Sequence, residues 1–156
     1  MTRREIVEAI GRTIMRWQDA TEAYDDAVGE IAGLNGAERR CLSFLHDGPK
    51  TAGAIAAATG LTPAAITALV DRLEARGYLV RRRSEKDRRQ VLVEYGPVAR
   101  ELTARYYEPL AREGDEMMKR YSDAELAAVL RFLSEAVRIQ EGRQTALKQA
   151  GAAGTD

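Results

Sequence analysis

Residues 61–93 read LTPAAITALVDRLEARGYLVRRRSEKDRRQVLV. Thr62 followed by Pro63 is typical of a helix start, because threonine caps the first free N–H groups and proline suits the first helical position. Gly77 occupies the place of a left-handed helix end. Between these points the apolar residues recur at helical spacing, at Ile66, Leu69, Val70 and Leu73. The stretch therefore predicts a helix over 62–76 with one buried face.

The remainder of the stretch predicts a β-hairpin. The runs 78–83 and 90–95 are rich in β-branched and aromatic residues, and the polar segment SEKDRR lies between them. Upstream, Asn35 with Glu38 opens one short helix, and a second extends from the cap Thr51 to Ala58 before Gly60. The second of these helices and the helix over 62–76, joined by a tight turn that contains Gly60, outline a helix-turn-helix. With the hairpin behind it, this outline becomes a winged helix.

Charge is unevenly distributed along the chain. Lys+Arg and Asp+Glu number 24 each, so the net charge of zero favours no class of partner. Between Arg72 and Arg89, however, eight basic and three acidic residues give a net +5, which leaves −5 for the remainder. The run 81–90 alone holds six basic residues and two acidic ones. After a helix-turn-helix we expect this run to bind an anionic partner, with a solvated loop as the alternative.

Long helices are predicted on both sides of the winged helix. Apolar residues recur at spacings of three and four over 2–31, behind a capping box formed by Thr2 and Glu5. About 30 helical residues extend roughly 45 Å, too far for a domain of this size to bury. Part of this helix should therefore meet another chain. Gly96 and Pro97 begin a further helix with a kink expected at Pro109, and its apolar residues are expected to face inward.

The predicted fold class is mainly α with a small β-hairpin wing (α+β), a winged helix-turn-helix flanked by long helices. Residues 1–34 and 97–148 form the expected outer helical region, 35–96 the winged helix-turn-helix, and 149–156 a disordered tail.

The stretch that opens this section also resembles the MarR family of winged-helix transcriptional regulators. The resemblance rests on its LTP start, the helix end VDRLEARG and the DRR of the wing, and it extends to nearly the whole chain in helix order and length. It implies a homodimer whose dimerisation helices are residues 1–34 and 97–148. It also implies that residues 35–96 are the DNA-binding region, which binds a pseudo-palindromic site in double-stranded DNA. Such proteins are usually repressors of nearby genes, released by a small anionic or aromatic effector.

Candidate DNA contacts follow on the face of helix 62–76 opposite the apolar stripe. A helix of this size fits the major groove, which is about 12 Å wide. We expect a phosphate or cap role for Thr62, methyl contacts from Ala64 and Ala65, a hydrogen bond from Thr67 and a phosphate contact from Arg72. MarR-like proteins often carry a basic or polar residue where this chain has Ala68. Much of the specificity should therefore rest on the wing and on DNA shape.

In the wing, the resemblance implies that Asp87 pairs with a nearby arginine while Arg89 enters the minor groove. Arginine suits a narrow, electronegative minor groove because its guanidinium loses water more readily than an ammonium. The other wing cations are expected on phosphates: Arg81, Arg82, Arg83, Lys86 and Arg88.

Other residues have a functional and a structural interpretation. Trp17 and Tyr24 are candidates for an effector pocket, although core or dimer-interface positions are common for such aromatics. His46 is a third candidate, with a capping or surface role as the alternative. Cys41 is expected to be an inert core thiol.

Several classes are disfavoured by the sequence. One histidine and one cysteine give no basis for a zinc site, and no cofactor is expected. No catalytic motif indicates an enzyme, and the absence of a long apolar segment predicts a cytoplasmic protein without membrane contact. The alternative function is a winged-helix module for protein–protein assembly, whose binding would depend only weakly on salt.

Overall fold

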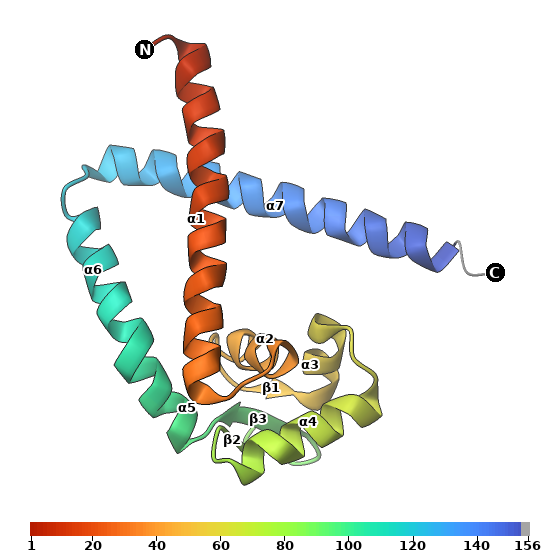
Figure 1. Ribbon diagram of the computed structural model, residues 1–156. Helices are drawn as coiled ribbons and strands as arrows, with labels where there is room; N and C mark the ends of the chain where they lie inside the picture. Colours follow the sequence, from red (N-terminus) through yellow and green to blue (C-terminus); the bar gives the residue numbers. More distant parts are fainter. Residues whose placement is uncertain (154–156) are drawn as a thin grey trace. The chain divides into compact units, whose positions relative to one another are not determined.

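The computed structural model describes residues 1–153 of the chain (Figure 1). It contains two compact units, Met1–Glu108 and Pro109–Asp156. The first unit holds the long N-terminal helix and the entire winged helix, and the second holds helices joined by a short turn, with no strand among its described residues. The predicted division into dimerisation and DNA-binding regions concerns function and stays a prediction.

Helix α1 spans Arg3–Ala32, within one residue of the predicted range. Its capping box is confirmed: the Thr2 hydroxyl accepts from the Glu5 N–H at 3.3 Å, and the Glu5 carboxylate accepts from the Thr2 N–H at 2.7 Å. Gly33 ends the helix in the left-handed conformation, with φ of 61°.

Three short helices follow, each with its predicted cap. Helix α2 spans Gly36–Phe44 behind Asn35, α3 spans Ala52–Thr59 behind Thr51, and α4 spans Pro63–Ala75 behind Thr62. Gly60 ends α3 in the left-handed conformation, which makes the tight turn between α3 and α4. The helix-turn-helix outline is confirmed.

The wing is a hairpin of β2 (Leu79–Arg83) and β3 (Val91–Tyr95). A third strand, β1 (Lys50–Thr51), adds to the other edge of β3 and gives the antiparallel order β1-β3-β2 (Figure 1). In this sheet Lys50 pairs with Val93, and Arg81 pairs with the same residue from the opposite side. The short strand β1 was not predicted.

Gly96 follows β3 at a point where the backbone folds closely on itself. Its N–H donates to the carbonyl of Tyr78 at 2.7 Å, and a Cβ at this position would lie 2.3 Å from the carbonyl oxygen of Gly77. Glycine is therefore required here for steric reasons.

One hydrophobic core joins α2, α3, α4, the sheet and α5 (Pro97–Leu102). The four apolar residues predicted for α4 are all at most 2% exposed. Cys41, Leu42 and Leu45 supply the inner face of α2, and the Tyr95 hydroxyl donates to the Leu42 carbonyl at 2.8 Å. The core cluster consists of Cys41, Leu42, Leu45, Ile55, Ile66, Leu69, Val70, Leu73, Tyr78, Leu79, Val93 and Ala99.

Beyond α5 the helix changes its hydrogen-bond pattern. Residues Thr103–Tyr107 form a π-helical turn, η1, and the N–H of Glu108 donates to the carbonyl of Thr103. Helix α6 then spans Glu108–Met118. The expected irregularity thus occurs in the turn before Pro109, whose missing N–H cannot extend the regular α-helical pattern.

The second unit continues α6 and contains α7, Asp123–Ala153. Ser122 and Glu125 form a reciprocal cap, in which the Glu125 N–H donates to the Ser122 hydroxyl. The Ser122 hydroxyl and N–H donate to the Glu125 carboxylate, and these two bonds lower the pKa of Glu125. Residues 149–153 belong to α7, so the expected disordered tail is wrong over this part, where alanine favours continuation of the helix. The rest of that prediction, 154–156, lies outside the described residues.

The outer helices leave many apolar side chains exposed, whereas those of the helix that begins at Pro97 were expected to face inward. On α6 and after it, the exposed residues are Leu110, Met117, Met118 and Tyr121. On α7 they are Val129, Leu130, Phe132, Val137, Ile139 and Leu147. A single chain supplies no second layer to cover these side chains.

Within residues 1–153, no helix taken by itself is long and apolar enough to cross a membrane. Helices α3 and α4 reach that apolar content only as a pair bent by 110°, and their large apolar side chains belong to the core.

Candidate nucleic-acid interface

Helix α4 presents the predicted face to solvent. The Thr62 hydroxyl accepts from the Ala65 N–H at 3.3 Å, so its side chain acts as the helix cap. Thr67 donates its hydroxyl proton to the Pro63 carbonyl at 3.0 Å. The hydroxyl oxygen of Thr67 can then still accept a hydrogen bond. The six candidate residues are all exposed: Thr62, Ala64, Ala65, Thr67, Ala68 and Arg72. This face is small, and Arg72 supplies most of its hydrogen-bond donors.

The tip of the wing is a tightly bonded turn. Ser84 is buried, and its hydroxyl accepts from the N–H groups of Lys86 and Asp87, both at 3.3 Å. The Asp87 carboxylate accepts from the Arg89 N–H at 3.0 Å. Among the ion pairs of the described residues, none joins Asp87 to an arginine, so the pairing implied by the resemblance is replaced by a backbone hydrogen bond.

Two of the predicted phosphate-binding arginines are held by carboxylates instead. Arg81 pairs with Asp71, at 2.6 Å, and with Glu74, both on α4. Arg82 pairs with Glu94 of the neighbouring strand at 2.7 Å, and this bond raises the pKa of its guanidinium. These contacts tie the wing to α4 and its two strands to one another.

The remaining wing cations have no carboxylate within ion-pair distance in the described part of the chain. They are Arg83, Lys86, Arg88 and Arg89, and all four are exposed. The basic run therefore consists of paired cations at its base and four unpaired ones toward its tip.

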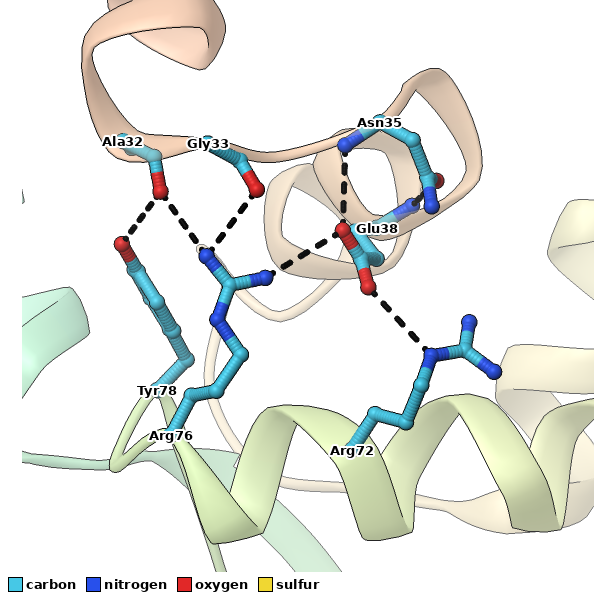
Figure 2. A network of polar contacts seen from close by, with 7 residues as sticks. All are labelled: Ala32, Gly33, Asn35, Glu38, Arg72, Arg76 and Tyr78. Carbon is cyan, nitrogen blue, oxygen red and sulfur yellow. Dashed lines mark hydrogen bonds and ion pairs between the residues drawn. The ribbon is translucent and has the colours of Figure 1, made fainter.

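A network around buried Glu38 connects α4 with the ends of α1 and α2 (Figure 2). The Glu38 side chain is 5% exposed, and its two oxygens lie 3.6 Å from Arg72 Nε and from Arg76 Nη1. The carboxylate also accepts from the Asn35 N–H at 3.0 Å. Since an unpaired buried charge is costly, the two arginines make this burial tolerable.

Arg76 also caps the C-terminus of α1. Its Nη2 donates to the carbonyls of Ala32 and Gly33, both at 2.9 Å, and the Tyr78 hydroxyl donates to Ala32 at 3.0 Å (Figure 2). A guanidinium at this end complements the partial negative charge of the helix terminus. Sequence reasoning identified Glu38 as a cap of α2 and missed this network, because its partners lie far along the chain.

The three effector candidates do not come together. Trp17 lines an open depression of about 420 Å³, which is completed by Gln18, Thr21, Glu22, Asp25 and Arg39. The Tyr24 hydroxyl donates to the Tyr106 carbonyl at 2.7 Å, and His46 is exposed near the end of α2.

Asp25 in this depression also accepts from the Tyr107 hydroxyl at 2.9 Å. Burial, together with this bond to a carboxylate, raises the pKa of Tyr107.

Cys41 is fully buried, and burial raises the pKa of its thiol to about 11. The reactive thiolate is therefore disfavoured, which agrees with the predicted core role. In the described residues, no three histidine, cysteine or acidic side chains are grouped so as to hold a metal ion.

Comparison with known proteins agrees with this architecture. The family model described as the MarR family matches residues 32–90, from the end of α1 to the wing. The chain is 31% identical over 130 residues to the uncharacterized HTH-type transcriptional regulator YcgE of Bacillus subtilis (strain 168), covering 83% of this chain and 84% of that protein.

Two solved structures share the fold. Transcriptional regulator Tm0710 from Thermotoga maritima is 22% identical, with a TM-score of 0.59, covering 88% of this chain and 98% of that one. NadR in complex with 4-hydroxyphenylacetate is 18% identical, with a TM-score of 0.56, covering 83% and 93%. The match to the family model and the relation to YcgE over most of both chains show that this chain belongs to the MarR family of DNA-binding transcriptional regulators.

Proposed function

We propose that the chain is a homodimeric, sequence-specific regulator that binds a pseudo-palindromic operator, represses nearby genes and is released by a small molecule. Helix α4 enters the major groove, and the wing enters the adjacent minor groove. The observation that carries this proposal is the placement of four unpaired cations on a hairpin tied directly to the exposed face of α4.

The two contact elements divide the work of recognition. The small face of α4 allows its backbone to approach the bases, with Ala64 and Ala65 against thymine methyl groups and Thr67 as a hydrogen-bonding group. Arg72 is half exposed while it pairs with Glu38, so its guanidinium can also meet a phosphate. Sequence preference then depends strongly on the wing, with Arg89 in a narrow minor groove.

Dimerisation through residues 1–34 and 97–148 is supported by the apolar side chains that the outer helices expose. On α1 these are Ile6, Val7, Ile10, Met15, Trp17, Tyr24 and Ile31. Exposed apolar surface of this extent is typical of an interaction site. A two-fold dimer would place two recognition helices on half-sites roughly 34–36 Å apart. Sedimentation equilibrium tests this assembly, for which we expect twice the monomer mass at micromolar concentration.

An effector site beside Trp17 is supported by the depression on α1 and by the small aromatic acid bound to NadR. Its charged lining of Glu22, Asp25 and Arg39 favours an uncharged or cationic aromatic over an anion. Trp17 is the chain's only tryptophan, so its emission reports directly on this site. Titration with 4-hydroxyphenylacetate and with its amide should change the emission, more strongly for the amide, and should release bound DNA.

Fluorescence anisotropy against duplex DNA tests the central proposal. The DNA upstream of the chain's own gene is compared with a scrambled duplex across a salt series, for the wild type, Arg89→Ala and Lys119→Ala. Lys119 is a matched control because it is an exposed cation of the second unit, paired with Glu116 at 2.5 Å.

We expect tight binding to the upstream DNA, with log affinity falling by about 0.9 per neutralised phosphate for each tenfold rise in salt. Arg89→Ala should weaken it, and Lys119→Ala should not. Equal, weak binding to both duplexes that is insensitive to Arg89→Ala would instead favour the protein–protein module.

A further inference from the structure

Two carboxylates occupy the side of α4 that the proposed function turns toward DNA. Asp71 continues the exposed stripe of Ala64, Thr67 and Ala68 at helical spacing, and its side chain is 58% exposed. Glu74 lies one turn further, with its side chain 37% exposed. Carboxylates placed this way repel a phosphate backbone, so the recognition helix carries a feature that opposes its own function.

Arg81 is directed at both carboxylates. Its Nη2 lies 2.6 Å from Asp71 Oδ1, its Nη1 contacts Glu74, and its backbone N–H donates to Glu74 Oε1 at 3.2 Å. Two guanidinium nitrogens are thus engaged within the protein, and the side chain is only 31% exposed. A phosphate contact by Arg81 would have to share a guanidinium whose charge is already directed at these two carboxylates.

We propose that Arg81 is an internal counterion of the recognition helix: it neutralises negative charge from Asp71 and Glu74 at the DNA interface and makes no phosphate contact of its own. The inference rests on the proposed function, since it matters only where DNA meets α4. It makes Arg81 a positioning residue whose effect on binding passes through the two carboxylates.

The proposal predicts that affinity follows the summed charge of the three side chains. This sum is −1 in the wild type and −2 in Arg81→Ala. It is 0 in the triple variant Arg81→Ala/Asp71→Asn/Glu74→Gln and +1 in the double variant Asp71→Asn/Glu74→Gln. Each unit should change the affinity for duplex DNA by about three- to tenfold, given screened Coulomb interactions over about 10 Å.

The four proteins are compared by fluorescence anisotropy on a mixed-sequence 30-base-pair duplex over a salt series. Circular dichroism melting is measured beside it to confirm that each is folded. Arg83→Ala is the matched control. Arg83 lies two residues after Arg81 on the same strand, but among the described residues it has no carboxylate partner. We expect Arg81→Ala to be weakest, the triple variant to equal or exceed the wild type with an unchanged salt slope, and the double variant to bind most tightly.

Two other rankings would overturn the inference. If Arg81 contacts a phosphate, the triple variant stays as weak as Arg81→Ala and loses about 0.9 from its salt slope, as Arg83→Ala should. If Arg81 acts only as a mechanical tie, all three variants bind more weakly than the wild type, whatever their charge. A wild type that binds no duplex would overturn the proposed function together with this inference, whereas the first two results leave the function standing.

Discussion

Substitution of Glu38 by glutamine tests the network that joins α4 to the ends of α1 and α2. The amide keeps the size of the side chain and an oxygen for the Asn35 N–H, while it removes the negative charge that faces Arg72 and Arg76. The bonds from Arg76 to Ala32 and Gly33 are untouched. The change therefore isolates the ionic part of the network.

The expected magnitude follows from the geometry. Removing one partner of a fully buried ion pair costs about 3–5 kcal/mol. Here both separations are 3.6 Å, and the arginine side chains are 56% and 38% exposed, so water screens much of the interaction. We expect Glu38→Gln to lower the free energy of unfolding by about 1–2 kcal/mol, with a fall in Tm of roughly 2–8 °C.

Urea unfolding followed by circular dichroism, at one fixed protein concentration, measures this loss. Glu8→Gln is the matched control, because Glu8 pairs with Arg4 at 2.9 Å on the exposed surface of α1, where the side chain of Glu8 is 49% exposed and that of Arg4 is 88% exposed. This control should lose less than about 0.5 kcal/mol. If Glu38→Gln loses no more than Glu8→Gln, the buried carboxylate does not hold the two elements together and the reasoning is refuted.

Further predictions concern the core, the glycines and the thiol. Leu73→Ala should lower the free energy of unfolding by about 2–5 kcal/mol in urea titrations, because Leu73 is fully buried. Leu130 is exposed, so Leu130→Ala should change the free energy of unfolding of the isolated monomer little. Gly96→Ala should lower Tm because its Cβ would overlap the Gly77 carbonyl. Gly11 has open space around it, so Gly11→Ala should add about 1 kcal/mol of helix stability. Equal effects of the two substitutions in thermal melts would contradict the close approach of Gly96 to Gly77. Since burial raises the pKa of Cys41 from 9.0 to about 11, its contribution to stability should be complete below pH 9 and should decline as the pH rises toward 11. The decline should be smaller in Cys41→Ala, where only the tyrosines with raised pKa contribute to it. A native thiol that reacts with Ellman's reagent as fast as the unfolded chain would contradict its burial.

Local signals in the sequence predicted most of the helices and strands. The caps at Thr2, Asn35, Thr51 and Thr62 were predictable because each pairs with a residue only three positions away. Apolar periodicity identified the buried face of α4 for the same reason. Elements defined by partners distant in sequence were missed, such as β1, two residues long and recognisable only by its pairing with β3.

The residues of the candidate DNA interface were predictable from the composition of the chain, but their ion-pair partners were not. The basic run was visible at once, yet nothing local to Arg81 or Arg82 indicates that their charges are directed at carboxylates of α4 and β3. Likewise, Glu38 has the appearance of a surface cap until the fold brings Arg72 and Arg76 against it. The inward orientation expected after Pro97 was wrong at Leu110, Met117 and Tyr121, because a periodic stripe shows that a face is apolar without showing what covers it.

The alanine-rich face of α4 has an evolutionary consequence. Ala64, Ala65 and Ala68 are exposed while the opposite face forms the core, so a longer side chain at any of these positions reaches outward without disturbing the packing. Single-codon changes at these sites can therefore add base contacts one at a time. A regulator built in this way can acquire new target genes by drift and selection while its scaffold and assembly stay unchanged.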